Sequence, residues 1–378
     1  MRNMTLTQTD TLTWAGDTTI AGDIERQGLI TRVDIGVEIV PSATFTAANE
    51  IDGLFRLLQN FRIVGGSHVY MTLPTDDACL GGTLLHYRSQ LDGFGYGHRD
   101  GGIVAPQSLY TPIIYPVHFG SHPFKDGREN PFDLSAVIPA QHESQLRMEW
   151  TTSGNDVVDA TSTVGTTSVL RLTIHSVRGT PQELRAEMMN QGVILPPGTT
   201  GMMPAWTGVV DSPTATTTDF DARTVALPTG GWLKRILVGV QDATATRSIR
   251  ASDELTRWSI NTNKNERLYQ AMFDLNLTKR LLGSNLTADS GALESAGTLK
   301  FGADFNAHAP QGIGEIDLRV RPLEAMDRLA NALNKEYGWD MRKVSRGDLS
   351  IGEFLGTNAS GDDMMYLFER YQAMTRPL

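Results

Sequence analysis

The chain has 378 residues, of which 20% are charged and 40% are hydrophobic, so it is long enough for two domains and too apolar for a disordered chain. Its 33 basic and 43 acidic residues give a net charge of −10, and its Thr- and Asp-rich start is not a basic arm. A protein that coats nucleic acid directly needs such an arm or a basic patch, because phosphate contacts supply most of its affinity. The composition therefore argues against direct nucleic-acid binding.

The single cysteine, Cys79, rules out an intrachain disulfide. Its setting in DACLGG is typical of a small buried residue rather than a nucleophile. The start of the chain lacks the apolar segment of a secretory signal, and no run approaches the ~20 apolar residues of a membrane span. We expect a soluble protein that is made in a cytoplasm and stabilised by packing and assembly.

Apolar residues at every second position predict β-strands through the first half of the chain. The clearest run covers residues 29–40, and one of its faces carries Val33, Ile35, Val37 and Ile39. Shorter runs at 69–73, 146–148 and 170–174 repeat the pattern. Asp-Gly pairs and a long loop at 93–131, rich in Gly, Pro and aromatic residues, separate these runs. The fold class predicted from this pattern is all-β with short helical inserts.

Helical patterns are confined to the middle and the end of the chain. Pro181 begins a short helix that leads to a linker with Pro196-Pro197-Gly198 and a Thr-rich stretch, followed by the opening strand of a second sandwich. An amphipathic helix is predicted after Pro322 and should end at Gly338, because its apolar positions are spaced three or four apart: Leu323, Met326, Ala330, Leu333 and Tyr337.

A second C-terminal helix is expected from Asp362, burying Met365, Phe368 and Met374. We expect these two helices to cover a sheet edge or an end of a sandwich. The alternative is that they reach a neighbouring subunit or a membrane surface.

The sequence also resembles itself. Three pairs of similar segments occur in the same order: Leu29–Val37 with Trp232–Val240, Tyr87–Asp92 with Tyr269–Asp274, and Phe132–Pro139 with Ala303–Pro310. The offset between the paired segments falls steadily along the chain, which is the pattern of a duplication whose second copy has shorter loops.

The duplication predicts two sandwiches in which Gly36 matches Gly239 and Asp133 matches Asp304. The strand at Val169–Val177 has no evident counterpart after Val320, where the chain is expected to turn helical.

No catalytic, cofactor-binding or metal-binding residue is predicted. His118 and His122 have the spacing of a helical metal pair, but Gly120 and Pro123 are incompatible with a helix there. Both histidines are expected to pack within the long loop. The segment Gly97–Gly102 superficially resembles a kinase catalytic loop but lacks the accompanying Asn and Gly-rich loop.

Carboxylates are the remaining candidates for chemistry. A β-sandwich enzyme acting on carbohydrate would need a close pair, for which Glu143, Glu149 and Asp133 lie near strands. Solvated positions that alternate with core residues explain these three better. The pairs Asp76-Asp77 and Asp362-Asp363 lack the spacing of a calcium loop. The chain is not predicted to be an enzyme.

The duplicated segments Leu29–Val37 and Trp232–Val240, with the Tyr-x4-Asp and Asp-x2-Ala-x2-Pro elements, resemble the double jelly-roll major capsid proteins of tailless icosahedral DNA viruses, including membrane-containing bacteriophages. The resemblance covers about residues 28–322. It implies two consecutive eight-stranded jelly rolls, with a helical C-terminal tail beyond them. The expected division is an N-terminal segment (1–27), a first jelly roll (28–180), a linker and second jelly roll (181–322), and the tail (323–378).

This resemblance implies a structural protein without catalytic residues. It would form a homotrimer that packs with neighbouring trimers in the icosahedral shell of a virion, after synthesis in the host cytoplasm. Minor capsid proteins and an internal membrane are expected partners, and no cofactor or direct nucleic-acid contact is expected. The alternatives are a virion spike or receptor-binding β-sandwich protein and, with less support, a carbohydrate-active enzyme.

Overall fold

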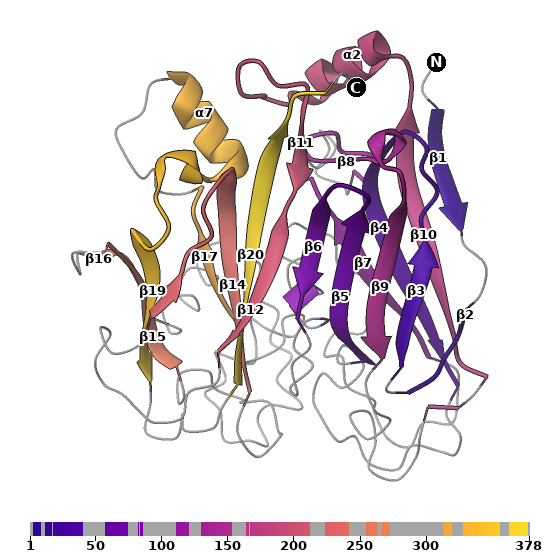
Figure 1. Cartoon of the computed structure of the whole chain (residues 1–378), viewed down its shortest axis with the longest axis horizontal. Coiled ribbons are helices and arrows are strands. Elements are labelled where there is room, and N and C mark those ends of the chain that lie inside the picture. The colour runs from indigo at the N-terminus through magenta and orange to yellow at the C-terminus, as the bar shows by residue number, and fades with distance from the viewer. Residues whose placement is uncertain are drawn as a thin grey trace, which may run out of the picture.

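The computed structural model describes residues 3–8, 12–16, 18–40, 57–74, 82, 84–85, 111–120, 130–152, 164–165, 167–211, 224–241, 255–262, 267–272, 313–319, 328–355 and 363–376. These residues form two β-sandwiches that lie side by side, each made of two sheets (Figure 1). The all-β prediction with short helical inserts is therefore confirmed.

The first sandwich pairs a sheet of order β1-β10-β4-β7 with a sheet of order β6-β5-β9-β3. Two short strands extend the first of these sheets, β2 beside β10 and β8 beside β4. The strand bounds are β1 (Asn3–Gln8), β2 (Leu12–Thr13), β3 (Thr19–Asp23), β4 (Leu29–Ile39), β5 (Leu58–Gly65), β6 (Val69–Leu73), β7 (Thr111–His118), β8 (Ile138–Pro139), β9 (Leu146–Thr152) and β10 (Val169–Arg178).

The second sandwich repeats this plan with sheets of order β17-β14-β20-β12 and β13-β19-β15-β16. Here β11 pairs with β20, and β18 pairs with β14. The strand bounds are β11 (Gly201–Pro204), β12 (Trp206–Asp211), β13 (Thr224–Ala226), β14 (Trp232–Gln241), β15 (Leu255–Thr262), β16 (Arg267–Met272), β17 (Ile313–Asp317), β18 (Trp339–Asp340), β19 (Leu349–Leu355) and β20 (Asp363–Met374).

Both sandwiches have the jelly-roll strand order. If β1 and β2 count as one strand, β11 and β12 as one, and the short β8 and β18 are left aside, the described part of each sandwich has eight main strands. One sheet then contains the first, eighth, third and sixth strands, and the other contains the fifth, fourth, seventh and second. The prediction of two consecutive jelly rolls is confirmed.

The two copies agree in backbone detail as well as in strand order. The ladder between β10 and β4 shifts register at Thr31, and the ladder between β20 and β14 shifts at Lys234. The freed carbonyl groups of these two residues accept equivalent bonds, from Phe119 N at 3.1 Å and from Leu318 N at 3.0 Å. A bulge is a built feature of a sheet, so its repetition supports the pairing of Leu29–Val37 with Trp232–Val240 and of Gly36 with Gly239.

A glycine precedes the bulged strand in each copy, Gly28 with φ 73° and Gly231 with φ 77°. A side chain on Gly28 would collide with the carbonyl oxygen of Val177, and one on Gly231 with that of Tyr371. Val177 and Tyr371 occupy equivalent places on β10 and β20, opposite the first residues of β4 and β14. Glycine is required twice for one reason, since the strand must enter the sheet close to its neighbour's backbone.

The other two repeat pairs are wrong. Tyr269 on β16 lies opposite Ile260, as Met71 on β6 lies opposite Ile63, so Met71 is its counterpart and Tyr87 is not. The strand after Ala303–Pro310 is β17, which pairs with β14 as β7 pairs with β4 and therefore does not correspond to β9. Tyr87–Asp92 and Asp304 lie outside the described residues. Short apolar strands resemble one another, and this similarity produced the false matches.

The expected helix from Asp362 is also wrong, because this segment is the strand β20. β20 is the counterpart of β10, the strand that seemed to have no second copy. Met364, Tyr366 and Phe368 pack in the core of the second sandwich, whereas Met365 and Leu367 join the cluster that contains the core of the first. A strand buried on both faces has no polar alternation, so its sequence looks helical.

The two long helices confirm the other helical predictions. α2 (Pro181–Gln191) begins at the Thr180 cap with a capping box to Glu183. α7 (Arg328–Tyr337) is followed by Gly338 at φ 80°, while residues 323–327 of the predicted helix lie outside the described part. Both helices and both chain ends lie at one end of the molecule (Figure 1). None of the described helices is long and apolar enough to span a membrane.

The sandwiches extend beyond their expected bounds. Residues 1–27 supply β1, β2 and β3 of the first sandwich, although a separate segment was expected. Residues 323–378 supply β18, β19 and β20 of the second, so the described part of the tail is helical only at α7 and at the 3-10 turn η4 (Met341–Lys343). The N-terminal strands are short and polar, and they gain their stability from the neighbouring strand rather than from their own apolar pattern.

Candidate functional site

The three carboxylates considered for catalysis do not converge. Glu143 is buried beside the turn between β5 and β6, where it accepts hydrogen bonds from Tyr70 Oη and from Ser67 N at 3.0 Å. Its Oε1 also lies 2.9 Å from Nδ1 of His68. Burial opposes its ionisation, but the hydrogen bonds from Tyr70 and His68 outweigh burial and lower the pKa of Glu143. Burial, with the bond to Glu143, raises the pKa of Tyr70. The cluster fixes a turn.

Asp133 and Glu149 have structural partners of their own. Asp133 is buried and accepts bonds from the backbone N and the Oγ of Ser135, both at 2.9 Å. Glu149 is half-buried on β9, 3.8 Å from Arg62 and 3.7 Å from Arg147. These contacts account for all three carboxylates without a paired arrangement in a cleft.

The histidine and metal predictions have mixed outcomes. His118 ends β7, where it is buried and lies opposite Arg32 in the ladder, rather than in a loop as expected. Within the described ranges, no group of His, Cys, Asp and Glu side chains could hold a metal ion. The candidates Cys79, His122, Gly97–Gly102, Asp76-Asp77 and Asp362 lie outside these ranges.

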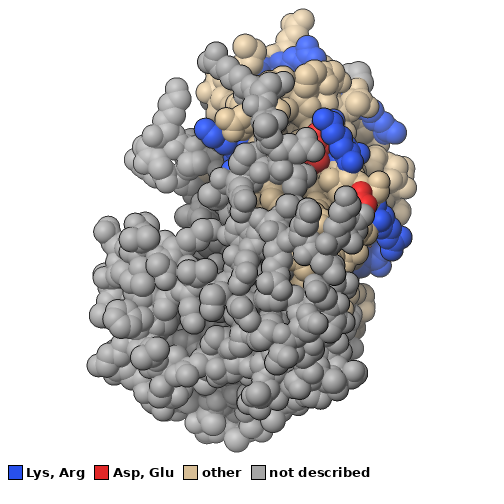
Figure 2. Space-filling view, turned by 90° about the vertical axis from the view of Figure 1, so that its left-hand side faces the viewer, with Lys and Arg blue, Asp and Glu red and all other residues tan. Residues whose placement is uncertain are grey.

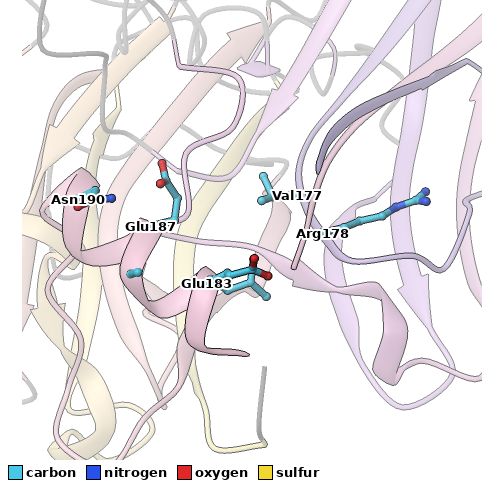
Figure 3. A pocket seen from close by; sticks show the side chains of 7 residues that line it. Val177, Arg178, Glu183, Glu187 and Asn190 are labelled. Carbon is cyan, nitrogen blue, oxygen red and sulfur yellow. The ribbon is translucent and has the colours of Figure 1, made fainter. Parts of the chain in front are cut away.

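One cavity of about 380 Å³ lies beside α2 (Figure 3). Its walls are Val177 and Arg178 from β10 and one side of the helix, including Glu183 and Glu187. Both glutamates have local roles, since Glu183 closes the capping box and Glu187 accepts a bond from Gln191 at 3.1 Å. The hydrogen bonds from Thr180 lower the pKa of Glu183. The two glutamates in the wall of the cavity therefore stabilise the helix.

Lys and Arg side chains are prominent on the described part of the face in Figure 2. Lys335, Arg342, Lys343 and Arg346, on α7 and on the segment from η4 onward, are exposed. Arg342 lies over the ring of Trp232 at 3.9 Å and binds Asp340 at 2.6 Å. Burial opposes ionisation of Asp340, but the bonds from Arg342 outweigh it and lower the Asp340 pKa. At least one member of this basic group therefore stabilises the fold.

The main contact built by the fold is the junction between the sandwiches, defined as β6, β12 and the residues that touch across them. β12 runs parallel to β6, with Trp206 opposite Met71 and Thr207 opposite Thr72. This ladder joins a sheet of each sandwich into one ten-stranded sheet. Trp206 and Met71 are both fully buried.

Hydrogen bonds and aromatic contacts extend the junction. Tyr371 Oη donates to the carbonyl of Phe119 at 3.0 Å, and Tyr337 Oη donates to the carbonyl of Ser135 at 3.0 Å. The ring of Phe119 meets that of Trp206 edge-on at 5.8 Å. Within the second sandwich, Arg235 Nε on β14 lies 3.4 Å from Glu369 Oε2 on β20, and both side chains are buried. The two sandwiches therefore share one sheet, one cluster of buried residues and side-chain hydrogen bonds.

We call the side of the β1-β10-β4-β7 sheet that points away from the first core its outer face. Asp34 on this face lies 2.5 Å from Arg32 Nε and 2.9 Å from His175 Nε2. Arg171 pairs with Glu38 further along. The sequence analysis considered only the apolar face of this strand, with Val33, Ile35 and Val37, and therefore missed the charged face. The alternation of opposite charges across β4 and β10 was the available signal.

Comparisons with known proteins identify the fold. No family model matches the chain, and no curated protein matches it by sequence. The crystal structure of the STIV MCP aligns with a TM-score of 0.64 at 15% identity, covering 98% of this chain and 97% of that one. The atomic structure of Sulfolobus Turreted Icosahedral Virus gives 0.64 at 16% identity over 98% and 91%. The PBCV-1 virus capsid model gives 0.56 at 10% identity over 98% and 94%. The chain has the double jelly-roll fold of these capsid structures.

Proposed function

We propose that this chain is a major capsid protein that builds the icosahedral shell of a tailless DNA virus such as a bacteriophage. The observation that carries the proposal is the arrangement of two complete jelly rolls in one chain, joined by a backbone ladder, which aligns along nearly the whole chain with the STIV MCP. Fold alone does not define function, and the supporting observation is the buried junction, which holds the two sandwiches side by side.

The assembly unit in this proposal is a homotrimer. Three copies would arrange six similar sandwiches around one axis and suit hexagonal packing with neighbouring trimers. Light scattering on the purified protein tests this, with electron microscopy at higher concentration. We expect trimers with interfaces well above ~1,000 Å² per contact, and then sheets or shells. A strictly monomeric species over a wide concentration range would contradict the proposal.

The proposed location is the virion, after synthesis in the host cytoplasm. Neighbouring trimers, minor capsid proteins and an internal membrane are the proposed partners. Direct contact with the genome is not proposed, because the chain carries a net charge of −10 and Arg342 of the exposed basic group is engaged by Asp340 and Trp232. Retention on a nucleic-acid column at 150 mM salt, on the order of physiological ionic strength, would argue against this part.

The proposed role is not catalytic. Glu143, Asp133 and Glu149 each stabilise the fold through the contacts described above. We expect no hydrolysis of glycans by the purified protein. Cleavage that disappears when one of these carboxylates is changed to the matching amide would favour the carbohydrate-active alternative. Binding of the isolated monomer to host cells would instead favour a spike or receptor-binding role.

A further inference from the structure

The junction inside the chain is a contact of defined type. β12 belongs to the first strand of the second sandwich, and its free edge pairs in parallel with β6. β6 is an edge strand of the first sandwich. The duplication means that the same two kinds of edge exist once more in the chain. These are β1 of the first sandwich and β16 of the second, which lie on opposite sides of the molecule (Figure 1).

The ladders fix which residues correspond on the first kind of edge. Thr7 on β1 lies opposite Ile174 on β10, and Thr207 on β12 lies opposite Phe368 on β20. In the next ladder, one residue pair stands between Ile174 and its bulge, and one pair stands between Phe368 and its bulge. Thr7 is therefore the counterpart of Thr207. Leu6 and Trp206, which precede them, are counterparts as well.

The second kind of edge is matched in the same way. Ile63 on β5 lies opposite Met71 and opposite Met148 of β9. Ile260 on β15 lies opposite Tyr269 and opposite Ile351 of β19, at the same positions of the copy. Tyr269 is therefore the counterpart of Met71, and Gln270 follows as the counterpart of Thr72. The register shift after Ile63 recurs after Ile260, which supports this match.

The apolar side chains of β1 are exposed, unlike the equivalent side chain of its counterpart β12 in the junction. Trp206 is 0% exposed in the junction, whereas Leu6, at the equivalent place on β1, is 61% exposed. Met4, two residues earlier on the same side of the strand, is 39% exposed. Among the described strands, β1 pairs only with β10, and β16 pairs only with β15. An edge strand with exposed apolar side chains is a template for pairing with another chain.

We propose that β1 of one copy adds in parallel to β16 of a second copy, with Leu6 opposite Tyr269 and Thr7 opposite Gln270. This contact rests on the proposed function, because it supplies the contact between subunits that a trimer needs. The contact is head-to-tail, since one side of each copy binds the opposite side of the next, and such contacts close into a ring when the rotation allows it. Backbone hydrogen bonds would provide the affinity, and burial of Leu6 by the second copy would fix the register.

The test is disulfide crosslinking in a background where Cys79, the single cysteine, is changed to Ser. The pair Thr7→Cys and Gln270→Cys lies in the proposed register, where neighbouring strands are about 4.8 Å apart and a disulfide can form. The pair Thr207→Cys and Thr72→Cys is the matched control, because these residues lie opposite each other within one chain. A third pair, Asn3→Cys with Gln270→Cys, is displaced by four residues along β1.

We expect the first pair to give covalent dimers and trimers after mild oxidation. The control pair should give a disulfide within one chain and no covalent oligomer, and the displaced pair should give at least tenfold less crosslinked oligomer. Trimers that form without the in-register crosslink, or with equal crosslinking of the displaced pair, would overturn this inference and leave the proposed function standing. A protein that stays monomeric while the control pair forms its bond would contradict both.

Discussion

The first sheet of each jelly roll has the same backbone in both copies but different surroundings. In the first copy, β4 alternates buried residues with half-buried ones, and its outer face carries Asp34 and Glu38. In the second copy, the described side chains of β14 are buried throughout, and Leu237 occupies the place of Asp34. In the second copy, the first sandwich of the same chain covers the outer face of the sheet that contains β14. In the proposed trimer, the polar face of the first copy is the corresponding surface, which stays in contact with water until another subunit covers it.

The buried cations at the bulges should give the largest difference between the copies. Arg235→Met removes a partner of Glu369, which is 0% exposed, and should lower the free energy of unfolding by about 3–5 kcal/mol. Arg32→Met at the equivalent place should cost about 1–2 kcal/mol, because its partner Asp34 keeps some solvent contact and lies next to His175. Urea denaturation of both variants measures the two values. Equal losses would mean that the outer face is as enclosed as the junction.

Exchanging the residues at two equivalent positions of β10 and β20 compares how tightly the outer faces of the two copies are packed. Thr173 and Leu367 lie at equivalent positions of β10 and β20, and Leu367 is 0% exposed. Leu367→Thr should cost about 2–4 kcal/mol, since it leaves a cavity and buries a hydroxyl group. Thr173→Leu should change the stability of the monomer by no more than about 0.5 kcal/mol. Thermal unfolding measures both, and a large loss in the second variant would contradict the comparison.

The turn at Glu143 should make an acid-sensitive contribution that the equivalent turn of the second sandwich lacks, and this effect should be the smallest. The 3-10 turn η2 (Ala140–His142) ends at Glu143, whereas the equivalent turn η4 ends at Val344. The folded pKa of Glu143 is lowered from its ordinary value of 4.5, so its contribution is present above that pH and is lost as the pH falls through the folded pKa.

Glu143→Gln should therefore cost about 1–2 kcal/mol at pH 7 and flatten the loss of stability below about pH 4.5. The measurement is a series of urea titrations between pH 3 and pH 7. The variant Val344→Ala serves as the control, because it should leave the shape of the pH profile unchanged. An unaltered acid profile in Glu143→Gln would show that other groups control the acid response.

The sequence was sufficient for features whose cause is local. The alternation at Val33, Ile35 and Val37 predicted β4, and the similarity of Leu29–Val37 to Trp232–Val240 located the duplicated strand. Gly28 and Gly231 would have strengthened that match, because each stands three residues before the bulge residue. The pattern after Pro322 predicted the end of α7 at Gly338.

The sequence could not predict features that depend on contacts between the copies. β20 is apolar on both faces only because the first sandwich covers one of them, so its pattern in sequence resembled a helix. A single leucine in a polar stretch, Leu6 does not by itself indicate a binding edge in the sequence. Only the structure shows that it is equivalent to Trp206 in the junction. Candidate residues such as Glu143 were found by sequence, but their partners Tyr70 and His68 come from a distant hairpin.

The position of β20 at the end of the chain affects how the protein can be made. Its long ladder with β14 links residues 232–241 to residues 363–374. A ribosome therefore synthesises β14, apolar on both faces, well before the strand that must lie beside it. The edge of β6 likewise stays unpaired until β12 is synthesised, although the other strands of its sandwich are complete once β10 has emerged. During synthesis the nascent chain exposes unpaired apolar edges, so its yield in cells should depend on chaperones that bind such edges until translation ends.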